Sequence, residues 1–258
     1  QVSIKTKNLE EVLALFDEFE TTTYSVAWID TLTRGKNIGQ SILQLGTHLS
    51  LSDLQENPPL MLHKRKALRV PIDFPSFTLN QFSISAFNFL YYHKQLRRQK
   101  KCIVPYQPFF YPLDSLLDWN RIYGKKGFIQ YQLVLPKAAG KSGLTQVLQF
   151  LHQHRLYSFL SVLKLFGAGE GMMSFPMAGY TLTLDIPLRR RIFPLLDELD
   201  HLVLDHGGRL YLTKDARMKP EIFRQMYPRW EEFLQIIQRL DPEGQIQSLQ
   251  SQRLGLRP

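Results

Sequence analysis

Residues 128–136 read FIQYQLVLP, and this stretch decides how the second half of the chain folds. Polar and apolar side chains alternate along it, which predicts a β-strand because successive side chains of a strand point to opposite faces. The segments that follow are a helix over 143–154, strands over 158–167 and 179–188, a helix over 189–206 and a short strand over 209–213 after the turn Gly207-Gly208. The sequence therefore predicts an α+β fold: an antiparallel sheet built on a ferredoxin-like βαββαβ unit, with both helices on one face.

The sheet face opposite the helices is a candidate site. Gln130 and Gln132 share one face of the first strand, and Thr181 and Thr183 share one face of the third. The first and third strands are central neighbours in this topology, so we expect these four side chains to lie close together. Lys164 interrupts the apolar run SVLKLFG, where a lysine must reach water, pair with an acid or face a cavity. A merely water-exposed polar face is the alternative.

The first half of the chain carries weaker patterns. It predicts a helix over 8–20 capped by Asn8, strands over 24–32 and 41–49, and an irregular proline-containing connection over 52–77. An aromatic and basic run over 82–101 admits three interpretations: a solvated helix, a nucleic-acid patch, or a loop resting on an anionic membrane. The apolar residues 89–92 favour contact with lipid or another domain. After the sheet, we expect a helix over 220–240, broken near Pro228, and a polar tail.

Composition narrows the class of protein. The chain has 258 residues, 44% of them hydrophobic, which is enough for one or two cores, and a net charge of +9 that favours anionic partners. No stretch has the length and apolarity of a membrane-spanning helix. Cys102, the single cysteine, excludes a disulfide framework, and the histidine spacings suit no metal site. Because the chain starts at Gln1 rather than Met, we expect it to be the later part of a longer protein.

Eight ordered motifs between residues 24 and 230 resemble one family, and the resemblance extends from about Asn8 to Leu256. They are YSVAWID, FFYPLD, DWNRIYG, GFIQYQLVLP, YSFLSVLKLFG, SFPMAGYTLTLDIP, GGRLYLTKDAR and MYPRW. They are similar to the decaprenylphosphoryl-β-D-ribose 2′-oxidases, flavoenzymes of the vanillyl-alcohol oxidase superfamily that are related to the sugar-lactone oxidases. The resemblance implies a substrate-binding (cap) domain over 1–208 and a C-terminal segment over 209–258 that returns to an FAD-binding domain. That preceding domain would bind most of the FAD.

The resemblance also implies roles for individual residues. Lys214 matches the family's essential catalytic lysine, and Tyr211 matches its neighbour beside the flavin. The residues that match the substrate pocket are Trp28, Phe110, Arg121, Gln130, Gln132, Leu160, Lys164, Phe166, Thr181 and Thr183. Mycobacterial members have tyrosine at the position of Phe110, asparagine at that of Thr181 and cysteine at that of Thr183, so the sugar recognised is open.

The implied activity is oxidation of a sugar hydroxyl by hydride transfer to FAD, on a pentose linked to polyprenyl phosphate and used in the cell wall. A soluble aldonolactone oxidase of the D-arabinono-1,4-lactone type is one alternative. A basic nucleic-acid-binding module is another, although such sheets need aromatic side chains on the open face, so we expect no nucleic acid. The implied partner is a short-chain dehydrogenase that reduces the keto product. The expected location is the cytoplasm, with peripheral contact to the anionic inner membrane as a further expectation, and the chain alone is expected to be inactive.

Overall fold

The computed structural model describes residues 1–50, 52 and 67–257. The chain divides into two compact units, Gln1–Phe128 and Ile129–Pro258, each with its own strands and core. Most of the irregular connection predicted over 52–77 lies outside the described residues. The sequence predicted a different boundary, between residues 208 and 209, where the chain would return to an FAD-binding domain. The two compact units do not test that boundary, which stays a prediction.

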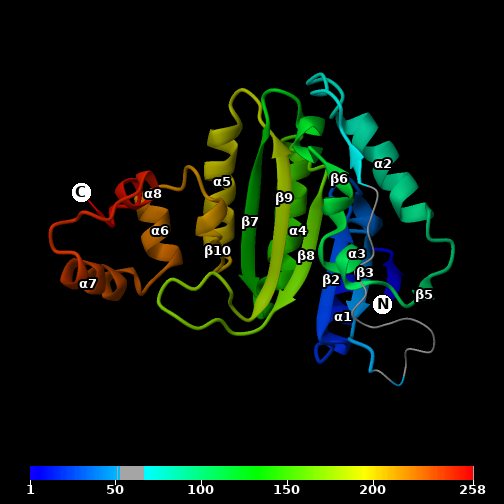
Figure 1. Ribbon diagram of the computed structural model, residues 1–258, viewed down its shortest axis with the longest axis horizontal. Helices are drawn as coiled ribbons and strands as arrows, with labels where there is room; N and C mark the ends of the chain where they lie inside the picture. Colours follow the sequence, from blue (N-terminus) through cyan, green and yellow to red (C-terminus); the bar gives the residue numbers. More distant parts are fainter. Residues whose placement is uncertain (51, 53–66, 258) are drawn as a thin grey trace. The chain divides into compact units, whose positions relative to one another are not determined.

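Four strands of the first unit lie in the order β2, β3, β1, β5 (Figure 1). They are β1 (Val2–Thr6), β2 (Tyr24–Ile29), β3 (Ser41–Gly46) and β5 (Gln99–Lys101). The strands expected over 24–32 and 41–49 are confirmed with shorter ends, whereas β1 was not predicted. Helix α1 (Leu9–Glu18) follows β1 and buries an apolar face made of Leu9, Val12, Leu13 and Phe16. Its predicted N-cap is confirmed, because the Asn8 side chain accepts a hydrogen bond of 3.0 Å from the Glu11 amide.

The aromatic and basic run of the first unit is a helix followed by a strand. Helix α2 (Gln81–His93) starts at a capping box formed by Asn80 and Ser83, and the basic residues after it lead into β5. Of the three interpretations, a helix is therefore correct for residues 81–93 and a loop is wrong there, whereas contact of this run with lipid or nucleic acid stays a prediction. The shorter elements of this unit are η1 (Gly35–Asn37), β4 (Leu68–Arg69), α3 (Tyr106–Phe110), η3 (Pro112–Ser115), β6 (Leu116–Leu117) and η4 (Trp119–Tyr123).

The second unit contains the predicted ferredoxin-like arrangement. Its elements are β7 (Phe128–Pro136), η5 (Lys137–Ala139), α4 (Gly140–Gln153), β8 (Ser161–Phe166), β9 (Gly179–Pro187), α5 (Ile192–Asp205) and β10 (Arg209–Leu210). The strands lie in the order β10, β7, β9, β8, so the first and third strands of the unit are central neighbours as expected. The strand predicted over 209–213 is wrong beyond Leu210. A 3₁₀ turn, η6 (Leu212–Lys214), replaces it because the Lys214 amide bonds the Tyr211 carbonyl at 3.0 Å.

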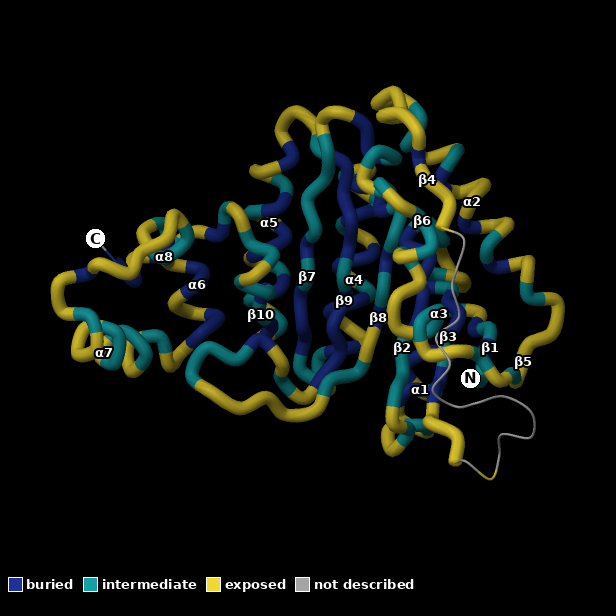
Figure 2. The backbone as a smooth tube through the Cα atoms, in the orientation of Figure 1, coloured by how far each residue is buried: buried dark blue, intermediate teal, exposed yellow. Residues whose placement is uncertain are grey.

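Both helices of this unit pack on one face of its sheet. The Tyr131 hydroxyl of β7 donates to Asp200 of α5 at 2.9 Å. Gly140 of α4 lies against the Tyr180 ring of β9, so close that a Cβ there would come within 2.4 Å of a ring carbon. Because side chains alternate along a strand, Gln130 and Gln132 point to the opposite, open face. Figure 2 shows β9 buried along almost all of its length and β7 buried mainly in its second half.

Three helices complete the second unit: α6 (Pro220–Met226), α7 (Trp230–Leu240) and α8 (Leu249–Arg253). The break predicted near Pro228 is confirmed. The segment expected to be a polar tail forms α8 and then buries Leu254 and Leu256, so it packs on the unit instead of lying in solvent. In the described ranges, none of the helices has the length and the apolar character that crossing a bilayer requires.

Candidate functional site

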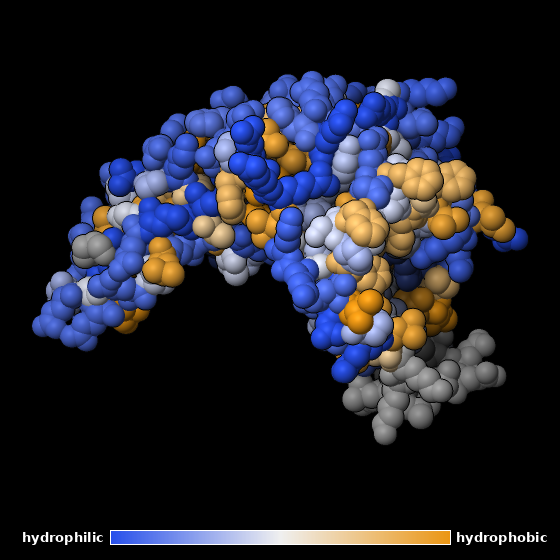
Figure 3. All heavy atoms as spheres, turned by 90° about the horizontal axis from the view of Figure 1, so that it is seen from above, coloured by the Kyte–Doolittle hydropathy of each residue, from blue (hydrophilic) through white to orange (hydrophobic). Residues whose placement is uncertain are grey.

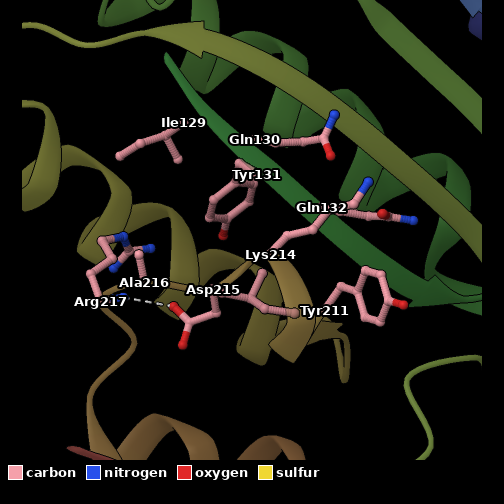
Figure 4. A pocket seen from close by; sticks show the side chains of 10 residues that line it. Ile129, Gln130, Tyr131, Gln132, Tyr211, Lys214, Asp215, Ala216 and Arg217 are labelled. Atoms are coloured by element: carbon pink, nitrogen blue, oxygen red, sulfur yellow. Dashed lines mark hydrogen bonds between the residues drawn. The ribbon is translucent and has the colours of Figure 1, made fainter. Parts of the chain in front are cut away.

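A pocket opens where β7 meets the segment that follows β10. Its space is about 310 Å³, part of it open to solvent. The lining residues are Ile129, Gln130, Tyr131, Gln132, Leu210, Tyr211, Lys214, Asp215, Ala216 and Arg217. Figure 4 shows the Lys214 side chain extending from the turn toward the two glutamines of β7. The structure thus brings together four residues that the sequence singled out: Gln130, Gln132, Tyr211 and Lys214.

Lys214 is the cationic group of this pocket. Its side chain is half-buried, and its Nζ lies 5.8 Å from the centroid of the Tyr211 ring. Burial lowers the pKa of the Lys214 ammonium below its ordinary value; the charge of Asp185 opposes this shift, and the charge of Lys164 adds to it. Lys164 and Asp185 therefore belong to the electrostatic surroundings of Lys214, although neither lines the pocket.

The turn that carries Lys214 is held by the C-terminal helix α8. Gln250 donates from its side chain to the Leu212 carbonyl at 2.6 Å. Arg253 donates to the Asp215 carboxylate at 2.8 Å, and the other carboxylate oxygen of Asp215 accepts from two backbone amides that follow it. These bonds restrain the backbone on both sides of Lys214, which keeps its ammonium directed into the pocket.

A buried ion-pair network ties the same segment to helix α5. Arg217 donates to Asp200 at 2.6 Å and to Asp197 at 2.5 Å, and Tyr131 also donates to Asp200. Asp200 is 1% exposed, and burial raises the pKa of its carboxyl while the bonds from Arg217 oppose that shift. The positive charge of the Arg217 guanidinium offsets the free-energy cost of burying the Asp200 carboxylate.

The two glutamines are each bonded to a side chain of β9. Gln130 donates from its amide nitrogen to Asp185 at 2.7 Å, and Gln132 donates to the Thr181 hydroxyl at 3.1 Å. Asp185 is 0% exposed, and burial raises the pKa of its carboxyl to about 6. The expected proximity is therefore present between Gln132 and Thr181, which bond directly across the central pair of strands, whereas the partner of Gln130 on β9 is Asp185. The expected proximity of Thr183 stays a prediction.

The remaining predicted residues of the second unit lie on β8 and β9 or next to them. Lys164 is exposed and stands directly opposite Thr181 in the register of β8 and β9. Thr183 is half-buried, two residues further along β9 on the same face. Leu160 accepts a hydrogen bond from the Asp185 amide at 3.1 Å, and Phe166 makes an edge contact with Phe175. Their predicted contacts with substrate stay predictions.

Three predicted pocket residues belong to the first unit. Trp28 is buried in a small core cluster, with its ring 4.8 Å from that of Tyr91. Phe110 makes an edge contact with Tyr24 at 4.8 Å and remains 39% exposed. Arg121 donates to the Pro71 carbonyl at 2.8 Å, so this guanidinium contributes to the fold of its own unit. That these residues share a site with Lys214 stays a prediction.

Sequence reasoning did not assign Asp185, Asp215 or Arg217 to the site. Asp185 left a signal, since it follows Thr181 and Thr183 at strand spacing in a run that is otherwise apolar. Asp215 and Arg217 left none, because the side chains that pair with them, Arg253 for Asp215 and Asp197 and Asp200 for Arg217, lie far away in the sequence. Phe175 was also missed; its ring stacks on Tyr211 at 4.7 Å, so it forms a wall behind this side chain. Within the described part of the chain, no group of three or more acidic, histidine or cysteine side chains is placed to hold a metal ion.

Comparison with known proteins finds chains that are similar to this one. The chain is 34% identical over 257 residues to the decaprenylphosphoryl-beta-D-ribose oxidase of Mycolicibacterium smegmatis, a match that covers 97% of this chain. Almost the whole length of this chain is therefore similar to one portion of the oxidase. The family resemblance inferred from the motifs is thereby confirmed, and the structure confirms the predicted α+β fold.

The match covers only part of the oxidase. The chain spans about half the length of that oxidase, 55% of it. An uncharacterized protein from Streptomyces coelicolor is 41% identical over 97 residues, which is 37% of this chain and 26% of that protein. No family profile matches the chain. Nearly half of the oxidase has no counterpart in this match.

Proposed function

We propose that this chain forms the substrate-binding part of an FAD-dependent oxidoreductase that oxidises a hydroxyl of a ribose carried on polyprenyl phosphate. The observation that carries this proposal is the meeting of Lys214 with Gln130 and Gln132 in one pocket. The similarity to a decaprenylphosphoryl-beta-D-ribose oxidase over 97% of the chain supports the reaction class and the sugar. The amides suit the hydroxyls of a sugar, and the cation suits a site where negative charge develops.

The residues of the pocket fit one edge of a flavin. A half-buried ammonium and an aromatic ring, those of Lys214 and Tyr211, face the pocket together, while the Asp215 carboxylate is already occupied by Arg253 and backbone amides. FAD, when bound, supplies the hydride acceptor. Lys214 would hold a fixed positive charge where the flavin gains negative charge, an interaction typically worth about 3–4 kcal/mol in a preorganised site. The two amides would orient the sugar so that its carbinol hydrogen faces the flavin.

The experiment is anaerobic stopped-flow reduction of the flavin in the full-length protein, with a short-chain polyprenylphosphoryl-β-D-ribose as substrate. Lys214→Ala should retain the yellow FAD but lose bleaching by at least about 100-fold, which is the cost of removing one preorganised charge. The matched control is Lys125→Ala, at an exposed lysine of a turn, which should reduce flavin as the wild type does. Undiminished bleaching in Lys214→Ala contradicts the proposed role. If the wild type oxidises a phosphate-free pentonolactone faster than the polyprenylphosphoryl ribose, the soluble lactone is the substrate instead.

We also propose that the outer face of α2 rests on an anionic membrane, where a polyprenyl-linked substrate resides. The helix buries Ile84, Asn88 and Tyr92 at intervals of four residues. Its opposite face carries Phe82, Phe89 and Leu90, which are 83%, 61% and 68% exposed. This face is apolar where a solvated helix is polar. The right-hand side of Figure 3 shows apolar side chains gathered on the side where Figure 1 places α2.

Basic side chains flank this apolar face. Lys94 follows the helix directly, with its Nζ 3.9 Å from the ring of Tyr91, and the exposed Lys100 and Lys101 form the end of β5. Exposed aromatic rings beside lysines are the composition that binds the surface of anionic lipid. In sedimentation with vesicles containing phosphatidylglycerol, the double variant F82S/F89S should lose most of its binding. The control L240S, which alters an exposed leucine of α7, should bind as the wild type does, and salt-independent binding to neutral vesicles would refute the proposal.

A short-chain dehydrogenase that reduces the keto product remains the proposed partner. Its support is the resemblance, since a ketone formed at a sugar carbon is the substrate class that such enzymes reduce. The measurement is conversion of the product to an epimerised alcohol by the two proteins together with a reduced nicotinamide, compared with the oxidase alone.

A further inference from the structure

The hydrogen bonds of the two pocket glutamines fix which end of each amide faces the ligand. The hydroxyl of Thr181 donates its single proton to the Leu133 carbonyl at 2.8 Å. A hydroxyl that has already donated can only accept from a further partner. The group that Gln132 presents to Thr181 at 3.1 Å must therefore be its NH₂, which leaves its amide oxygen on the other side.

The same reasoning holds for Gln130, with a carboxylate in place of the hydroxyl. Asp185 accepts from the Gln130 NH₂ at 2.7 Å. Because burial raises the pKa of Asp185 only to about 6, the group is ionised at neutral pH, and an ionised carboxylate has no proton to donate. The backbone amide of Asp185 donates to the Leu160 carbonyl and to the Ser158 hydroxyl, which fixes the main chain there, and the side chain is fully buried. Its Oδ2 is buried without a hydrogen-bond partner among the described residues, which costs desolvation free energy.

We propose that Asp185 and Thr181 are positioning residues that hold both amide oxygens toward the pocket, so that the site selects a sugar by two hydroxyl groups that donate hydrogen bonds. Figure 4 shows the Gln130 and Gln132 oxygens on the side of Lys214, with their nitrogens directed away from it. A free glutamine amide can turn either end toward a ligand, whereas these two are held with the oxygen, a hydrogen-bond acceptor, facing the pocket. This specificity rests on the proposed function, and it narrows the substrate class to sugars with two free hydroxyls at the reacting end.

A deoxy-fluoro sugar tests this specificity, since carbon-bound fluorine is close to hydroxyl in size but cannot donate. The probes are a short-chain polyprenylphosphoryl-β-D-ribose and its 2-deoxy-2-fluoro and 3-deoxy-3-fluoro analogues, added as competitors to the full-length FAD-containing protein. The wild type should bind the hydroxylated sugar at least about ten-fold more tightly than one or both analogues, because an acceptor facing fluorine is left unpaired.

Two variants of similar size remove the constraint. Asp185→Asn keeps an acceptor for Gln130 but adds an NH₂, so the Gln130 amide can turn around. Its preference for hydroxyl over fluorine should fall to within about three-fold, and KM for the sugar should rise more than kcat falls. Thr181→Val removes the acceptor that orients Gln132 and should relax the preference at the other position, while Thr181→Ser keeps the hydroxyl and should restore it.

The outcomes separate this inference from the proposed function. If Asp185→Asn and Thr181→Val discriminate against fluorine as strongly as the wild type, the positioning role is overturned. If the wild type neither binds nor oxidises the polyprenylphosphoryl ribose, the proposed function fails instead. Should one variant fail to fold, as judged by its FAD absorbance and its sedimentation, the other still decides the matter, because each amide has its own positioning residue.

Discussion

The buried carboxyl of Asp185 makes the unfolding free energy of this protein depend on pH, and Asp185→Asn should remove this contribution. The side chain is fully buried, and burial raises its pKa from 3.8 to about 6, against the bond from Gln130 and the charge of Lys214, which both act to lower it. A carboxyl whose pKa is higher in the folded state than in the unfolded state favours folding when it is protonated. That contribution is present in full below pH 3.8 and is lost as the pH rises through about 6.

Asp185→Asn replaces the carboxylate with a neutral group of the same shape. The asparagine oxygen can still accept from Gln130, so packing and one hydrogen bond are kept while the cost of burying a charge disappears. A shift from 3.8 to about 6 corresponds to about 3 kcal/mol in full. Between about pH 4.5 and about pH 8, the variant should therefore gain about 2 kcal/mol of unfolding free energy relative to the wild type.

The assay is urea unfolding of both proteins at these two pH values, followed by tryptophan fluorescence, with the difference between proteins compared across pH. Taking this difference cancels the titration of the other groups. Asp73→Asn, at an exposed carboxyl, is the matched control and should keep the wild-type pH dependence. An identical pH dependence for Asp185→Asn and the wild type would refute the reasoning, because it would mean that Asp185 is neutral, or solvated, in the folded protein.

Three further predictions concern the second unit. Arg217→Met leaves the Asp200 carboxylate buried without its cation and should cost about 3–5 kcal/mol of unfolding free energy in urea, with Asp200→Asn restoring part of the loss in the double variant. Gly179→Ala places a Cβ 1.9 Å from a backbone oxygen of β7 and should lower the unfolding free energy by about 2–3 kcal/mol, visible as a lower thermal midpoint. Lys164→Met removes a like charge that lowers the pKa of Lys214, so the alkaline limb of flavin reduction should move to higher pH in stopped-flow measurements.

Strand alternation was sufficient to predict the sheet of the second unit. The strand expected over 128–136 has the observed limits, because Gln130 and Gln132 alternate with apolar residues in its middle and Pro136 stands at its end. The same alternation placed Gln130 and Gln132 on the face where Thr181 now bonds one of them. Periodicity is a local signal, and here the local signal and the tertiary structure agree.

The segment around Lys214 could not be predicted in the same way. Residues 209–213 look like a strand, yet the chain leaves the sheet after Leu210. The side chain of Gln250, 38 residues further on, donates to the Leu212 carbonyl, and the turn bond to Tyr211 closes locally. Long-range partners of this kind leave no pattern in the segment itself, which is why tertiary contacts override its β-propensity. The strand β1 was missed although Val2 and Ile4 alternate with Ser3 and Lys5, a short local signal that its pairing with β3 makes clear.

The division between local and long-range signals suggests how specificity can change in this pocket. The lysine and its turn depend on bonds from α8 and α5, so substitutions there should affect the fold together with the chemistry. Position 181 is different. A threonine whose proton is used on the Leu133 carbonyl admits one orientation of Gln132, whereas an asparagine, the residue that the family resemblance places there, carries both a donor and an acceptor and admits two. Exchange of these residues would alter which sugar groups are read while leaving Lys214 and its supports untouched, so variation at 181 is expected to track substrate rather than reaction.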